Sequence, residues 1–116
     1  MDIDEETGRK IQELQILEQH LQGFLMDKQS FQIELNELLN ALEEIKKTED
    51  DVYKIIGGIM IKADKKELSK ELDEKKKIFE LRISSIEKQE KLIENKASYL
   101  RTELNDFFHK KERLKS

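Results

Sequence analysis

The sequence contains no cysteine and no proline, and only 6% of its residues are aromatic. Without cysteine the chain forms neither disulfide bonds nor thiolate metal sites, as is common in a reducing compartment. Without proline nothing interrupts a helix, so helices can run far beyond the globular average of about 11 to 12 residues. Because 41% of the 116 residues are charged, little remains to fill a globular core. These absences favour long, solvent-exposed helices.

Long apolar runs are also missing, and none approaches the roughly 20 residues that a membrane-spanning helix needs. The first six residues, MDIDEE, are acidic where a secretion signal would be basic and then apolar. The net charge of -4 is spread over interleaved signs, whereas a nucleic-acid-binding surface usually shows a basic face or stripe. We therefore expect a soluble cytoplasmic protein that binds neither a membrane nor a nucleic acid.

The most informative segment is residues 51–62, which read DVYKIIGGIMIK. Two β-rich runs flank Gly57 and Gly58, which can adopt the positive φ of a two-residue turn. A two-stranded hairpin is marginal by itself in water, and the rest of the sequence offers no further strand. The missing strands must come from other chains, so an oligomer interface is predicted. Its expected residues are Val52, Tyr53, Ile55, Ile56, Ile59, Met60 and Ile61.

Before this segment, apolar residues follow alternating three- and four-residue spacings, which are typical of a coiled coil. The seam residues are Leu14, Leu17, Leu21, Phe24, Lys28, Phe31, Leu35, Leu38, Leu42 and Ile45. Only Lys28 breaks the pattern, and we interpret it as a side chain that reaches solvent and fixes the register rather than as a substrate contact. Lys46 and Lys47 fall in the expected last turn, where cations stabilise the end of a helix.

After this segment, Asp64-Lys65-Lys66-Glu67 has the pattern of a helix start with a capping residue. An apolar spine then repeats every seven residues, as Leu72, Phe79, Ile86, Ile93, Leu100, Phe107 and Leu114. The positions three residues after the spine are polar, whereas Ile83, Ala97 and Leu104 stand four residues after it. We therefore expect a locally shifted seam.

The expected fold is mostly α, a long antiparallel coiled-coil hairpin with a single β-hairpin at the helix–helix connection. We predict one domain over residues 1–116, with a helix over 5–48, the β-hairpin over 52–62 and a helix over 65–114. If Lys47 faces Lys65, the numbers of facing residues sum to about 112, and each arm runs for about 40 residues, or roughly 60 Å.

No residue pattern indicates catalysis, a metal site or a cofactor. In the expected register His20 and His109 are far apart, and His109 with Glu112 alone makes a poor metal site that is more often a solvated surface. The Gly57-Gly58 pair lacks the spacing, lysine and following helix of a phosphate-binding loop. We expect no enzyme activity.

The order of these features resembles a prefoldin beta-type subunit. The resemblance covers essentially the whole chain, from the coiled-coil arm through DVYK, the two-residue turn and IMIK to the acidic-capped helix start. Its specific part is residues 52–72, including the Glu67-Leu68 and Glu71-Leu72 repeats. A single hairpin points to the beta class, because alpha-type subunits carry two.

The resemblance implies a molecular chaperone subunit. In this family two alpha and four beta subunits form a hexamer, in which the hairpins join in a double β-barrel platform. The arm tips hold unfolded polypeptides without ATP and deliver them to a group II chaperonin. The expected partners are therefore an alpha-type subunit, unfolded polypeptides and that chaperonin.

The residues that directly follow the second-helix spine are charged except for Phe108, near the end of the chain. With Ile3, Ile11, Phe107 and Leu114, it can form an apolar patch that grips the segments an unfolded client exposes. Alternatively, Phe107 and Leu114 simply close the coiled coil, and Phe108 covers its end. The residues alone leave both interpretations open.

Two other functions compete with the chaperone hypothesis: a structural coiled-coil adaptor that binds a partner helix, and a helical arm that binds RNA. Both need only a turn between helices, so the β-hairpin disfavours them. An RNA-binding arm also needs a continuous basic face, which the interleaved glutamates interrupt.

Overall fold

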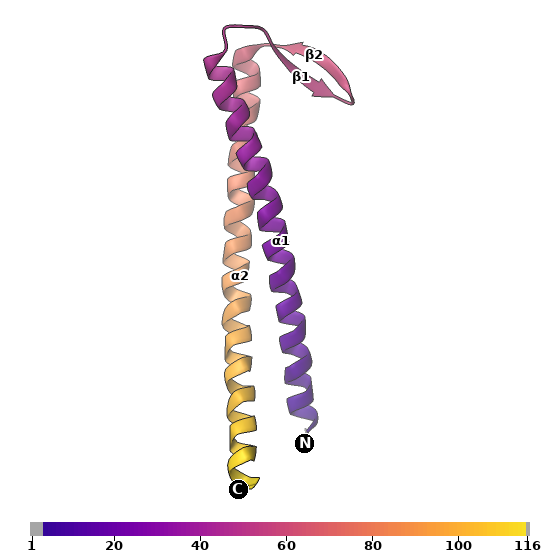
Figure 1. Cartoon of the computed structure of the whole chain (residues 1–116), viewed down its shortest axis with the longest axis vertical. Coiled ribbons are helices and arrows are strands. Elements are labelled where there is room, and N and C mark those ends of the chain that lie inside the picture. Colours follow the sequence, from indigo (N-terminus) through magenta and orange to yellow (C-terminus); the bar gives the residue numbers. More distant parts are fainter. Residues whose placement is uncertain (1–3, 116) are drawn as a thin grey trace. The chain divides into compact units, whose positions relative to one another are not determined.

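The computed structural model describes residues 4–115, and Figure 1 shows two helices joined through a β-hairpin. The elements are α1 (Glu5–Lys47), β1 (Val52–Ile56), β2 (Ile59–Ala63) and α2 (Lys65–Lys115). The predicted fold class is confirmed. Relative to the expected bounds, α1 ends one residue earlier, and β2 and α2 each end one residue later.

The chain divides into two compact units, each of which contains part of both helices. Unit 1 consists of Met1–Asp27 and Ile86–Ser116, and unit 2 consists of Lys28–Ser85. That the whole chain is one domain stays a prediction. Among residues 4–115, no helix has the length and apolar character needed to cross a membrane.

In unit 1 the two helices pack in opposite directions around a small apolar core. Leu17 of α1 is buried against Ala97 and Leu100 of α2. Lys10 and Glu103 form an ion pair across the same helices at 3.1 Å. When the residue numbers of each facing pair are added, the totals lie close to the sum that the sequence analysis predicts for facing residues.

Unit 2 contains the hairpin and the helix segments on either side of it. Its buried apolar residues are Leu35, Leu38, Leu42, Ile45, Leu68 and Ile83. Phe31 and Phe79 lie across the helices with 6.1 Å between ring centroids, and the Arg82 guanidinium lies 5.5 Å from the Phe31 centroid. Lys28 is half-buried at its seam position.

The shifted seam of α2 is confirmed by burial. Ile83, Ala97 and Leu104 are buried, whereas four of the positions three residues after the spine are fully exposed polar residues. The exposed positions are Lys75, Arg82, Gln89 and Lys96. The buried face of the helix therefore includes these residues four positions after the spine, because they carry apolar side chains.

Asp4 caps α1, a role that the sequence patterns did not single out. Its Oδ1 accepts a hydrogen bond from the Thr7 amide at 2.7 Å, and its carbonyl accepts one from the Gly8 amide at 3.0 Å. The hydrogen bond to Thr7 holds the pKa of the Asp4 carboxyl below its ordinary value. At the start of α2, the Asp64 carbonyl accepts the Leu68 amide at 2.8 Å, as expected for a cap position.

Thr48, expected as the last residue of the first helix, instead begins the connection to β1. Its hydroxyl accepts a hydrogen bond from the Asp50 amide at 3.1 Å. Its carbonyl accepts one from the Lys65 ammonium at 2.5 Å, which ties the connection to the first turn of α2. A threonine hydroxyl that binds a nearby amide competes with helix continuation, which explains the early end of α1.

The β-hairpin is a two-stranded antiparallel sheet, in which Ile56 pairs with Ile59 next to the turn and Val52 with Ala63 at the base. Gly57 and Gly58 have φ values of 56° and 81°. A type I′ turn requires positive φ at both central residues, and a residue with a Cβ adopts it at a cost.

We expect replacement of both glycines by valine to weaken oligomer assembly strongly, because β-branched residues resist positive φ. The single variant Gly57→Asn is the control and should assemble normally, since asparagine tolerates this conformation. Native mass measurements of both variants test the prediction. Equal loss of assembly in the two variants would show that the glycines matter for something other than backbone conformation.

Candidate functional site

The first candidate site is the hairpin surface, which we define as the exposed large apolar side chains of β1 and β2. Its members are Tyr53, Ile55, Ile56, Ile59, Met60 and Ile61, with exposed fractions between 43% and 71%. All six belong to the predicted oligomer interface, whose remaining residue, Val52, is half-buried at the base of the hairpin.

The hairpin surface occupies both faces of the sheet. Paired residues share a face and successive residues alternate. Ile55 and Met60 therefore lie with Tyr53 on one face, and the Ile56–Ile59 pair lies with Ile61 on the other. The six members of the hairpin surface are exposed, whereas Val52, Lys54 and Ala63, which share the face of Ile56 and Ile59 near the base of the hairpin, are half-buried.

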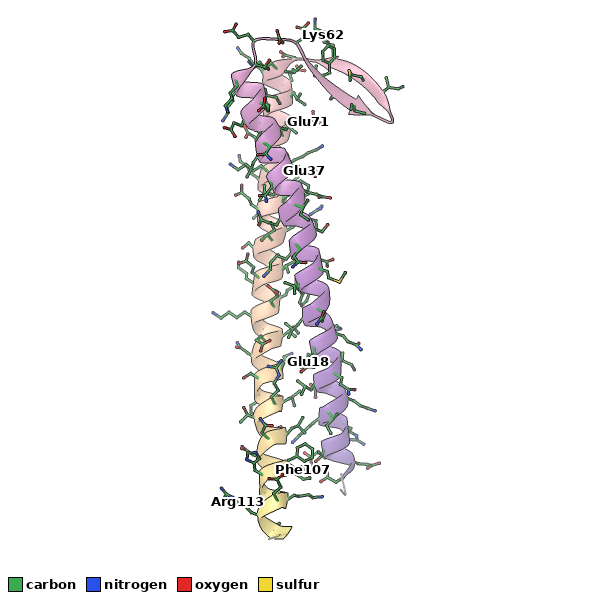
Figure 2. All side chains as sticks on the ribbon, in the orientation of Figure 1. Glu18, Glu37, Lys62, Glu71, Phe107 and Arg113 are labelled. Atoms are coloured by element: carbon green, nitrogen blue, oxygen red, sulfur yellow. The ribbon has the colours of Figure 1, made fainter. Side chains whose placement is uncertain are left out.

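Two ion pairs lie near the base of the hairpin. Lys54 of β1 pairs with Glu71 of α2 at 3.7 Å, and Lys62 of β2 pairs with Asp51 at 3.4 Å. Figure 2 labels Lys62 on the hairpin and Glu71 on the adjacent helix. Such solvated pairs add about 0 to 1 kcal/mol each, so they orient the hairpin more than they stabilise it.

The second candidate site is the arm end, the part of unit 1 that contains residues 4–11 and 104–115. Phe107 and Phe108 make an edge-to-face contact, with 5.4 Å between centroids and 73° between ring planes. The Lys111 ammonium lies 5.1 Å from the Phe107 centroid, within the range of a cation–π contact. Figure 2 labels Phe107 near the carboxyl end of α2.

The structure brings together only some of the predicted tip residues. Phe107, Phe108 and Ile11 are half-buried. Leu114 is 79% exposed, so it does not continue the buried seam. Ile3 lies outside the described residues.

Near the arm end, Lys10, Tyr99 and Glu103 form a polar cluster that the sequence patterns missed. Tyr99 and Lys10 both donate hydrogen bonds to the Glu103 carboxylate, which lower its pKa, the one from Tyr99 most. The same bonds raise the pKa of Tyr99 and of Lys10. The signal for the cluster was present in the i, i+4 spacing of Tyr99 and Glu103 and in the register that places Lys10 opposite them.

Arg101 makes a second polar cluster in unit 1. Its guanidinium lies 2.8 Å from Glu94 on the same helix and 3.5 Å from Glu18 on α1. Both clusters cross the helix pair and involve solvated groups, so they fix register more than they add stability.

These features have counterparts in known proteins. The model of the family described as "Prefoldin subunit" matches residues 9–111. The chain belongs to the prefoldin subunit family. It is 39% identical over 90 residues to the prefoldin subunit beta of Thermococcus onnurineus, covering 76% of this chain and 78% of the relative. A prefoldin subunit beta of Saccharolobus islandicus is 31% identical over 107 residues, covering 90% and 85%.

A solved structure is similar as well. The crystal structure of the prefoldin beta subunit from Thermococcus strain KS-1 aligns with a TM-score of 0.83 at 31% identity, covering 90% of this chain and 94% of that one. The predicted resemblance to beta-type prefoldin subunits is confirmed. The chain is thus a prefoldin chaperone subunit, of a family that acts in protein folding and whose subunits assemble with one another.

Proposed function

We propose that this chain is a beta-type subunit of an ATP-independent holdase in the cytoplasm. Two alpha and four beta subunits assemble through their hairpins, and the arm ends hold unfolded polypeptides and pass them to a group II chaperonin. Holding a client in this way requires no catalysis, metal ion or cofactor.

The observation that carries the proposal is the exposure of apolar side chains on both faces of a two-stranded sheet. An isolated hairpin of this kind is marginal in water, and its unpaired edges invite pairing with other strands. Assembly with other hairpins satisfies the backbone and covers the side chains. A coiled-coil adaptor has no need of such a hairpin.

The arm end supports the client-binding part of the proposal. Phe107, Phe108 and Leu114 provide apolar surface in a segment otherwise rich in charge. Each of these contacts is small. Several arms that bind one client at once can nevertheless hold it firmly, because the second and later contacts form within one complex.

Native mass spectrometry of the chain, alone and mixed with an alpha-type subunit from the same source, tests the assembly. We expect the mixture to give a complex of two alpha and four beta subunits. That complex should also suppress aggregation of a chemically denatured client protein without nucleotide. A mixture that leaves the two subunits separate, or a complex that does not protect the client, would contradict the proposal.

A further inference from the structure

Two methionines lie among the described residues 4–115, one on the hairpin and one on a helix. Met60 of β2 is 66% exposed, and Met26 of α1 is 68% exposed. The sequence has three methionines and no cysteine, so a mild oxidant that attacks side-chain sulfur meets only thioethers in this chain. Because their exposure is nearly equal, such an oxidant reaches Met26 and Met60 alike in the free subunit.

Met60 lies on the more exposed face of the hairpin. It pairs with Ile55, and the adjacent pair, Tyr53 with Lys62, has its side chains on the same face. All four residues are exposed. The opposite face is partly covered near its base, where Lys54 is half-buried and pairs with a glutamate of α2. Covering the face that carries Met60 therefore falls to another subunit.

Oxidation changes the chemical character of this side chain. Hydrogen peroxide transfers one oxygen atom to Sδ of Met60: the O–O bond breaks, an S–O bond forms and water leaves. The sulfur is oxidised by two electrons, and the peroxide is reduced by two. The product is a polar, chiral sulfoxide in place of an apolar thioether. Its oxygen is a hydrogen-bond acceptor, and burying such an acceptor among apolar side chains without a donor is unfavourable.

We propose that Met60 is an oxidation site that controls assembly. Hydrogen peroxide converts Met60 of the free subunit to the sulfoxide, which weakens its association with other subunits, and assembly in turn shields the thioether from the oxidant. Because this inference rests on the hairpin assembly proposed above, it adds a chemical control to that assembly. The modification is reversible, since methionine sulfoxide reductases restore the thioether. In that step the sulfoxide oxygen leaves as water, and a dithiol that becomes a disulfide supplies the two electrons.

Peroxide treatment of the free chain, followed by its removal, tests the effect on assembly. The unmodified chain and the variants Met26→Leu and Met60→Leu are compared, because leucine keeps the volume of methionine but cannot form a sulfoxide. Each chain is mixed with the alpha-type subunit over a dilution series, and native mass gives the midpoint of assembly with and without treatment.

We expect treatment to weaken assembly at least tenfold for the unmodified chain and for Met26→Leu. For Met60→Leu the treated and untreated midpoints should be equal. Incubation of the oxidised chain with methionine sulfoxide reductases and a dithiol should restore its assembly. Unchanged assembly of the treated Met26→Leu chain, with Met60 oxidation verified by peptide mass spectrometry, would overturn the inference.

Oxidation rates provide a second measurement that needs no substitution, because Met26 serves as a reference within the same chain. In the free subunit we expect Met26 and Met60 to be oxidised at similar rates. In the complex Met60 should be oxidised at least tenfold more slowly than Met26. Equal rates at the two residues in the intact complex would show that Met60 is not covered and would contradict the inference.

The outcomes separate this inference from the proposed function. If untreated subunits assemble and protect a client, and the chain oxidised at Met60 assembles equally well, only the control by oxidation is wrong. If oxidation weakens assembly but the untreated complex does not protect a client, the holdase proposal fails and the oxidation site stands. If the untreated chains do not assemble at all, both fail.

Discussion

A chain that carries both Ile55→Asp and Ile59→Asp is expected to remain helical and to stay out of the assembly. The two isoleucines lie on opposite faces of the hairpin, so whichever face is covered by other subunits receives a carboxylate. An unpaired charge buried in this way costs several kcal/mol, and each 1.4 kcal/mol weakens binding about tenfold. Native mass should therefore show monomers or small species at concentrations where the unmodified chain is fully assembled.

The control places the same chemical change on the helices. Ile16 and Ile33 are exposed isoleucines of α1, at 52% and 60%, so their replacement by aspartate buries no charge within the chain. The Ile16→Asp, Ile33→Asp variant should assemble normally. Full-size assembly of the hairpin variant would mean that the hairpin surface is not the interface.

The sequence predicted the architecture because each part of it has a local pattern. Alternating spacings define the seam of α1, and a pair of glycines between β-rich runs defines the turn. The shifted seam of α2 followed from the polar residues three positions after its spine. The assumed pairing of Lys47 with Lys65 gave a register with which the observed Lys10–Glu103 ion pair agrees.

The sites were less predictable because they depend on where elements begin and how they are oriented. Leu114 continues the seven-residue spine in sequence, but it is 79% exposed in the structure. The course of the connection between α1 and β1 depends on Thr48, whose hydrogen bonds to Asp50 and Lys65 no periodic pattern encodes. Local patterns thus identified the exposed apolar strands of the hairpin, whereas contacts between residues far apart in the sequence were not predictable from such patterns.

Removal of the arm end is expected to separate client holding from assembly. A chain that ends after Leu104 loses the Phe107–Phe108 pair and Leu114 but keeps Leu104, which is buried in the seam. It should assemble to the corresponding oligomer, because the hairpin belongs to unit 2 and the removed residues all belong to unit 1. Its suppression of client aggregation should fall several-fold or more, since all four beta arms of the proposed complex lose their contacts at once.

Two milder variants should lose less of the client protection. Phe108→Ser removes one ring of the pair, and a chain that ends after Lys111 keeps both rings together with the Lys111 ammonium over Phe107. Protection of a denatured client is measured by light scattering at equal oligomer concentration. It should be highest for the chain that ends after Lys111, lower for Phe108→Ser and lowest for the chain that ends after Leu104. If the chain ending after Leu104 protects the client as well as the full chain does, the phenylalanine pair only closes the coiled coil, and the client must bind along the arms or at the hairpins.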